Sequence, residues 1–204
     1  MGSSVPLHMR VALRRAALSL FLVQLWLFAA QQPAAHVRNF GKVDDHIYRG
    51  AEPSVIGLQE LGAMGIKTVI DLREASESTK FEQQQVEKLH IKYVNVPFPP
   101  LSAPSPDQIR RVLSLLLQND SQPIFVHCRR GKDRTGTVVA CYRIQHDRWK
   151  NEDAFDEAKK YGMSFAERGM RAYILHFSPL PITDVSTVPT QAALPGVAAT
   201  PAQP

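Results

Sequence analysis

Four short runs of apolar and β-branched residues are spaced along the middle of the chain, and longer segments with helical spacing separate them. Runs of this length predict buried β-strands, and strands that alternate with helices predict a sheet whose strands are mostly parallel. We therefore expect a single α/β domain with a central, mostly parallel sheet of about four to five strands, flanked by helices. The four runs are HIYRGA (46–51), IKTVIDL (66–72), IKYVNVPF (91–98) and PIFVHC (123–128).

The segment from residue 105 to residue 118 carries the clearest helix signals. Ser105 is a typical N-cap, Pro106 suits the first helical position, and Gln108 occupies the capping-box position. Apolar residues then recur at the spacing of one broad helix face. Further helices are predicted over 53–65, 135–146, 151–161 and 164–177, and the mixed-charge run 147–160 is typical of a solvated helix face.

The N-terminal segment has the order of charges and apolar residues found in secretory signal peptides. Three arginines precede an apolar run over residues 16–30, and small residues follow. The run is short for a membrane-spanning helix, and the alternatives are a tilted, retained anchor or a buried amphipathic helix. Residues 1–35 are therefore predicted to be a signal peptide or an N-terminal membrane anchor, which implies an exported (periplasmic or secreted) or membrane-anchored protein.

The C-terminal segment differs in composition from the rest of the chain. Residues 179–204 contain six prolines and no regular apolar period. Such a segment buries too little apolar surface to offset the entropy of ordering, so we predict a disordered tail. The folded domain is then expected over residues 36–178, a length that suits one hydrophobic core.

The charge argues against a nucleic-acid-binding protein, and the cysteine content argues against a small protein held together by disulfides. The formal net charge of +5 falls to +2 without the three N-terminal arginines, and no basic stripe interleaved with aromatics is present, so no nucleic-acid partner is expected. The two cysteines are too few for a disulfide scaffold. Cys141 falls on the apolar face of the helix over 135–146 and is predicted to be a core residue, out of disulfide reach of Cys128.

The segment HCRRGKDRTG (127–136) lies between a predicted strand and a predicted helix. A strand, a short turn and a helix aim several backbone N–H groups at one point, which attracts an anion. Gly131 permits a tight backbone path, and Arg134 offers a planar, charged fork that suits two phosphate oxygens. The segment therefore predicts a phosphate-binding loop.

Cys128 lies at the base of this predicted loop. The positive field that binds an anion also favours the thiolate, so Cys128 can act as an in-line nucleophile on phosphorus. Thr135 can donate its hydroxyl to the sulfur and stabilise it as a leaving group. His127 is expected to organise the loop rather than to act as a base, since a thiolate needs none.

The loop residues resemble a known catalytic signature, H-C-x-x-G-x-x-R-[S/T], of cysteine-dependent protein tyrosine and dual-specificity phosphatases. The matching residues are His127, Cys128, Gly131, Arg134 and Thr135. The segments IYRGAEP (47–53) and KTVIDLR (67–73) are similar to the start of small bacterial and atypical dual-specificity phosphatase domains. The resemblance covers roughly residues 43–177 and implies a phosphocysteine intermediate with no metal and no other cofactor.

The proton donor departs from the common pattern of this family, which places an aspartate on a separate loop upstream of the cysteine. The corresponding segment, 96–108, has no Trp-Pro-Asp, and Ser102 stands near the expected position. Asp107 is the nearest carboxylate, although the helix dipole alone favours an acid there. Asp133 is similar to a loop aspartate proposed as the donor in myotubularin-like and bacterial phosphoinositide-active phosphatases. Its alternative role is to cap the next helix or to pair with Lys132 or an arginine.

Asp71 and Arg73 fall at the carboxyl end of the second predicted strand, on the functional edge of an α/β sheet. We expect them to form a hydrogen-bonded pair that holds the loop rather than to take part in catalysis.

The substrate expected first is a phosphoprotein, with phosphotyrosine or phosphoserine/threonine as the group hydrolysed. Arg129, Arg130 and Lys132 add three charges beside the phosphate site, which also suits a phosphoinositide or inositol polyphosphate. A non-catalytic phosphate-binding module, a sulfurtransferase and an arsenate reductase are further alternatives. The predicted catalytic residues are Cys128, Arg134 and Asp133, and the predicted phosphate-binding residues are Arg129, Arg130, Gly131, Lys132, Asp133, Arg134 and Thr135.

Overall fold

A five-stranded sheet lies at the centre of the domain, with the strand order β1-β2-β5-β3-β4. In this computed structural model the described residues are 34–181. Only the pairing of β1 with β2 is antiparallel, and the other neighbours are parallel. The strands are β1 (Gly41–Lys42), β2 (Ile47–Ala51), β3 (Thr68–Asp71), β4 (Lys92–Asn95) and β5 (Ile124–Cys128).

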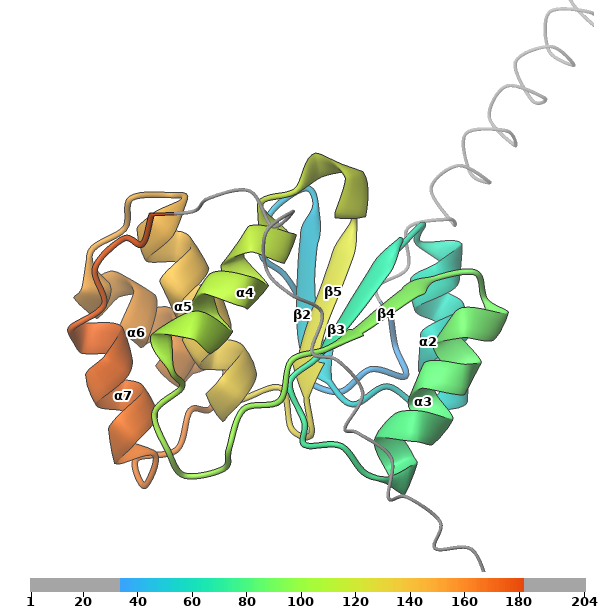
Figure 1. Ribbon diagram of the computed structural model, residues 1–204, viewed down its shortest axis with the longest axis horizontal. Coiled ribbons are helices and arrows are strands. Elements are labelled where there is room, and N and C mark those ends of the chain that lie inside the picture. Colours follow the sequence, from blue (N-terminus) through green and yellow to red (C-terminus); the bar gives the residue numbers. More distant parts are fainter. Residues whose placement is uncertain (1–33, 182–204) are drawn as a thin grey trace, which may run out of the picture.

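Helices cover both faces of this sheet (Figure 1). On one face lie α2 (Val55–Ala63) and α3 (Glu77–Lys88). On the other lie α4 (Pro106–Leu116), α5 (Asp133–Gln145), α6 (Asn151–Lys160) and α7 (Arg168–Leu175), and a short 3-10 turn, η1 (Asn119–Ser121), precedes β5. The expected single α/β domain with a mostly parallel sheet is confirmed.

The central strand β5 shows why the sheet is buried on both faces. Ile124, Val126 and Cys128 belong to the apolar core between the sheet and α4 to α7. Phe125, which points the opposite way in the alternation of a strand, belongs to the core under α2 and α3. All five residues of β5 are buried, as expected for a parallel strand covered on both sides.

A serine side chain caps the start of each of the helices α2, α3 and α4. Ser105 accepts a hydrogen bond from the backbone N–H of Gln108, and the side chain of Gln108 accepts one from Ser105, so the predicted capping box is present. α5 begins at Asp133, slightly earlier than expected. The helix predicted over 164–177 is shorter, because residues up to Glu167 form turns before α7 begins at Arg168.

Packing extends slightly beyond both ends of the expected folded domain. Ala34 is buried in the core under α2 and α3. At the other end, the backbone of Leu180 exchanges two hydrogen bonds with the side chain of Gln145. The rest of the predicted leader and tail lies outside the described residues. Within residues 34–181, no helix is both long and apolar enough to cross a membrane.

Candidate active site

The predicted phosphate loop connects β5 to α5 at the carboxyl edge of the sheet. Cys128 ends β5 and pairs in register with Ala51 at the end of β2, while His127 pairs with Asp71 at the end of β3. The loop therefore lies where parallel strands and a helix N-terminus converge, the usual ligand site of an open α/β sheet.

Gly131 makes the tightest turn of this loop. Its φ of 65° is in the left-handed region, and a Cβ placed on it would lie 2.4 Å from the carbonyl carbon of Gly50. Its carbonyl oxygen accepts hydrogen bonds from Arg49 Nη2 (2.9 Å) and Asn39 Nδ2 (2.7 Å). Only glycine fits here, and two side chains from the N-terminal part of the domain fix the loop.

Arg49 and Asn39 are site residues that the sequence reasoning missed. Arg49 is 1% exposed, and its guanidinium lies 3.7 Å from the centre of the Tyr161 ring. Burial lowers the pKa of Arg49 to about 10. A charged residue inside the apolar run of β2 was a usable signal, because a buried arginine needs a specific partner. Asn39 carried no comparable signal.

Cys128 is buried at 3% exposure. Burial raises the pKa of its thiol, but the net pKa is lowered by the hydroxyl and backbone N–H of Thr135, the charge of Arg134 and the backbone N–H of Arg130. The Thr135 hydroxyl has no other hydrogen-bond partner within residues 34–181, so it is free to donate to the sulfur. The loop thus favours the thiolate that nucleophilic attack requires.

Arg134, the second residue of α5, joins two other segments to the loop. Its Nη1 lies 3.3 Å from the carbonyl oxygen of Leu72, after β3, and 3.4 Å from that of Phe98, after β4. These contacts hold the guanidinium beside the cavity that contains Cys128.

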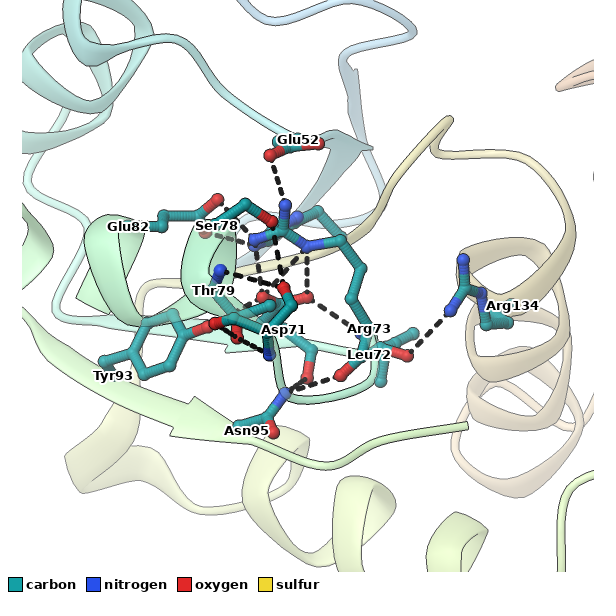
Figure 2. A network of polar contacts seen from close by, with 12 residues as sticks. Glu52, Asp71, Leu72, Arg73, Ser78, Thr79, Glu82, Tyr93, Asn95 and Arg134 are labelled. Atoms are coloured by element: carbon teal, nitrogen blue, oxygen red, sulfur yellow. Dashed lines mark hydrogen bonds and ion pairs between the residues drawn. The ribbon is translucent and has the colours of Figure 1, made fainter. Parts of the chain in front are cut away.

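A buried polar network lies beneath this edge of the sheet (Figure 2). Arg73 donates from Nε and Nη2 to the carboxylate of Asp71 and from Nη2 to Glu82 Oε2 at 2.6 Å. It also pairs with Glu52, and Tyr93 donates to Asp71 at 2.7 Å. The predicted pairing of Asp71 with Arg73 is confirmed, and it anchors the backbone next to Leu72, the acceptor for Arg134.

The same network reaches the residue before the nucleophile. His127 is fully buried, stacks on the Phe125 ring, and places Nε2 2.8 Å from Glu82 Oε1. Burial opposes protonation, but the charge and hydrogen bond of Glu82 raise the pKa of His127 above its ordinary value.

The donor atoms of Asp71, Glu82 and His127 lie within 4.8 Å of one another, close enough to be considered as a metal site. The Arg73 guanidinium already binds both carboxylates, which is the arrangement of an ion-pair network.

A cavity of about 640 Å³ opens above Cys128. The structure brings the predicted residues Cys128, Arg129, Arg130, Asp133 and Arg134 together around it. Arg38, Pro100, Leu101, Glu167 and Met170 complete its lining.

Three predicted site residues do not line this cavity. Gly131 and Thr135 are both buried. Gly131 makes the turn of the loop, and Thr135 contacts Cys128. Lys132 is exposed, its side chain packs beside Gly162, and it is not part of the cavity lining.

The two carboxylates considered as proton donors differ in position. Asp107 is exposed in the first turn of α4, pairs with Arg110 and is not part of the cavity lining. Asp133 lines the cavity, and its Oδ1 accepts a hydrogen bond of 2.7 Å from the backbone N–H of Ser164. Its Oδ2 lies 3.4 Å from Arg130. Asp133 therefore ties the start of α5 to the segment before α7.

A cysteine with a lowered pKa at the floor of a loop between a strand and a helix, with an arginine six residues later, defines a cysteine-dependent phosphatase of the dual-specificity-like tyrosine phosphatase class. The family described as "DSP-PTPase phosphatase fused to NAD+ Kinase" (PTP-NADK) matches residues 31–174. The chain belongs to this family.

Similar curated proteins carry two kinds of phosphatase name. Inositol diphosphatase DSP2 of Oryza sativa subsp. japonica is 29% identical over 162 residues, which is 78% of this chain and 78% of that protein. "Probable tyrosine-protein phosphatase DG1060" of Dictyostelium discoideum is 30% identical over 130 residues, covering 62% of this chain and 77% of that protein.

Solved structures share the fold. The catalytic core of the PP-IP phosphatase SIW14 from S. cerevisiae superposes with a TM-score of 0.61 at 26% identity, covering 70% of this chain and 86% of that one. TpbA of P. aeruginosa gives a TM-score of 0.59 at 22% identity, covering 67% and 83%, and shows the fold alone.

Proposed function

We propose that this phosphatase removes phosphate from inositol pyrophosphates or closely related polyphosphorylated inositols. The observation that carries the proposal is the set of four arginines around one cavity: Arg38, Arg129, Arg130 and Arg134. One phosphoryl group occupies the loop and engages Arg134. The exposed guanidinium groups of the other three are available to neighbouring phosphates of the same ligand, each through charge-assisted hydrogen bonds.

The names of similar proteins support this substrate class over the phosphoproteins that the sequence alone put first. An inositol diphosphatase is similar over most of its length, and so is the core of a PP-IP phosphatase. A phosphotyrosyl peptide delivers one phosphoryl group to the cavity and leaves three arginines without phosphate partners. It stays the second candidate, because one relative of comparable identity carries a tyrosine phosphatase name.

A substrate panel tests the proposal. Initial rates of phosphate release are measured for an inositol pyrophosphate, a phosphotyrosyl peptide, a phosphoseryl peptide and a phosphoinositide in vesicles. We expect kcat/KM for the inositol pyrophosphate to exceed that for either peptide by about 100-fold, since two additional charge-assisted contacts contribute roughly 3 kcal/mol. The Cys128→Ser variant serves as the control without a nucleophile. A preference for the phosphotyrosyl peptide would overturn the substrate assignment, and vanadate binding without any turnover would favour a phosphate-binding module.

A further inference from the structure

One carboxylate oxygen beside the cavity has no hydrogen-bond partner among residues 34–181. Glu167 immediately precedes α7 and lines the cavity together with Cys128 and Arg134. The residue is 5% exposed, yet its Oε2 has no hydrogen-bond partner within residues 34–181. Glu167 occupies the N-cap position of α7, but its side chain makes no capping hydrogen bond. Because an unpaired buried carboxylate is costly, folding alone does not account for this side chain.

The other carboxyl groups near the loop all have partners. Asp71 and Glu82 bind Arg73, and Asp133 accepts the backbone N–H of Ser164. Among the described residues that line the cavity, the carboxyl groups are those of Asp133 and Glu167. Glu167 is the one with a carboxylate oxygen still unpaired.

Glu167 precedes a helix that packs on the loop where the usual acid is absent. Gly169, in the first turn of α7, packs so closely on residues 102–103 that a Cβ on it would lie 2.7 Å from the Ala103 nitrogen. Leu101 of the same loop also lines the cavity. Glu167 therefore lines the cavity two residues before a helix turn that packs on the segment of Ser102, which stands near the position of the expected acid.

The surroundings of Glu167 also suit a proton donor. Burial, and next the negative charge of Asp133, raise the pKa of Glu167, and the opposing effects of Arg130 and Arg134 are smaller. A carboxyl group in such a site keeps its proton to a higher pH than an exposed one, which is what a general acid requires.

From these contacts we propose that Glu167 is the general acid and then the general base of the phosphatase reaction. The assignment rests on the phosphatase activity and holds for any phosphomonoester or phosphoanhydride that fits the cavity. In the first step the Cys128 thiolate forms an S–P bond as the P–O bond to the leaving group breaks, and Glu167 gives its proton to the leaving oxygen. In the second step water attacks phosphorus, Glu167 takes a proton from this water, and the S–P bond breaks to return the electron pair to sulfur.

Leaving-group dependence tests this role. The Glu167→Gln variant keeps the size of the side chain but cannot transfer a proton. We compare kcat/KM for phenyl phosphate, a poor leaving group, with that for p-nitrophenyl phosphate, a good one. The variant should lose about 100-fold on phenyl phosphate and less than tenfold on p-nitrophenyl phosphate, because proton donation matters most for the basic leaving oxygen.

Matched variants separate Glu167 from the other carboxylates. Asp107→Asn changes an exposed group outside the cavity and should leave both rates unchanged. Asp133→Asn keeps an oxygen for the Ser164 amide and should affect both substrates alike. In wild type, kcat/KM for phenyl phosphate should fall at high pH as the donor deprotonates, and only Glu167→Gln should lose this basic limb.

The possible results are distinct. An equal loss on both substrates in Glu167→Gln, or a basic limb that persists in it, overturns the assignment. Thermal unfolding and vanadate binding show whether Glu167→Gln folds. If it does not, the Glu167→Asp variant is used instead. Glu167→Asp should keep the basic limb of the pH profile, and loss of that limb in this variant contradicts the assignment. If wild type hydrolyses neither the two aryl phosphates nor the inositol pyrophosphate, the phosphatase activity itself is overturned, whereas wild-type turnover with an unaffected Glu167→Gln overturns only the role of Glu167.

Discussion

Cys128 is buried in the core beneath the loop, and burial by itself favours the neutral thiol. Hydrogen bonds from the Thr135 hydroxyl and backbone, together with the charge of Arg134, reverse this preference and lower the pKa. At the scale of single residues, the reactive form of the nucleophile therefore depends on Thr135. We expect the same hydroxyl to stabilise sulfur when the phosphocysteine breaks down.

Replacing this hydroxyl with a methyl group tests its role. In Thr135→Val the pKa of Cys128 should rise, and hydrolysis of the phosphocysteine should slow by about tenfold, the effect of one lost hydrogen bond to a charged group. The pH dependence of iodoacetamide alkylation measures the first effect, and burst kinetics measure the second. Thr137→Val is the control, since Thr137 is equally buried in α5 but bonds the Asp133 carbonyl. An alkylation profile identical to wild type would contradict this account.

At the scale of secondary structure elements, α3 and β5 are joined by one ion pair. Glu82 of α3 contacts His127 of β5 and Arg73 after β3. A single carboxylate therefore connects α3 to the strand that ends in Cys128. Since Glu82 raises the pKa of His127, the stabilisation by this pair is complete below the ordinary histidine pKa of about 6.5. It is lost as the pH rises through the folded-state pKa.

The Glu82→Gln variant should show this dependence as a difference in unfolding free energy. The substitution should cost about 3 kcal/mol at pH 6, because it leaves buried charges without a partner, and less at higher pH, where His127 becomes neutral. Urea unfolding in a pH series that starts at pH 6 and rises well above it measures this cost. Glu77→Gln, at an exposed position of α3 paired with Lys80, should cost under about 0.5 kcal/mol throughout the series. A cost of Glu82→Gln that stays constant across the whole series would contradict a contribution from the charge of His127.

At the scale of the whole molecule, the binding cavity is assembled from segments far apart in the chain. Arg38 comes from the segment before β1, Leu101 from the segment after β4, and Met170 from α7. Arg129 and Lys132 are neighbours in the phosphate loop, yet the fold turns them to different surroundings. Arg129 faces the cavity, while the Lys132 side chain covers Gly162.

This difference allows a matched comparison within one loop. Arg129→Ala should raise KM for an inositol pyrophosphate about tenfold, the equivalent of roughly 1.4 kcal/mol, and change KM for p-nitrophenyl phosphate less than twofold. Lys132→Ala should leave both values near wild type. Both measurements are made at low and at physiological salt, because screening weakens exposed charges. A larger effect from Lys132→Ala would mean that the substrate approaches over Gly162 instead.

Much of the fold and the catalytic loop could be predicted from local patterns. Strand runs, the capping box at Ser105 and the spacing from His127 to Thr135 are properties of neighbouring residues, so the chain order itself contains them. The exported or anchored location inferred from residues 1–35 stays a prediction, as does the disordered tail.

The sequence by itself determined the α/β class and predicted Cys128 as the nucleophile and Arg134 as a phosphate-binding residue, because each depends on residues a few positions apart. Tertiary structure alone decided that Arg49 and Asn39 donate hydrogen bonds to the Gly131 carbonyl oxygen, and that Lys132 does not line the cavity. It also brought Glu167 to within the same cavity as Cys128, although 39 positions separate them. Such contacts arise only when distant segments pack on a shared core, and no local periodicity or motif encodes them.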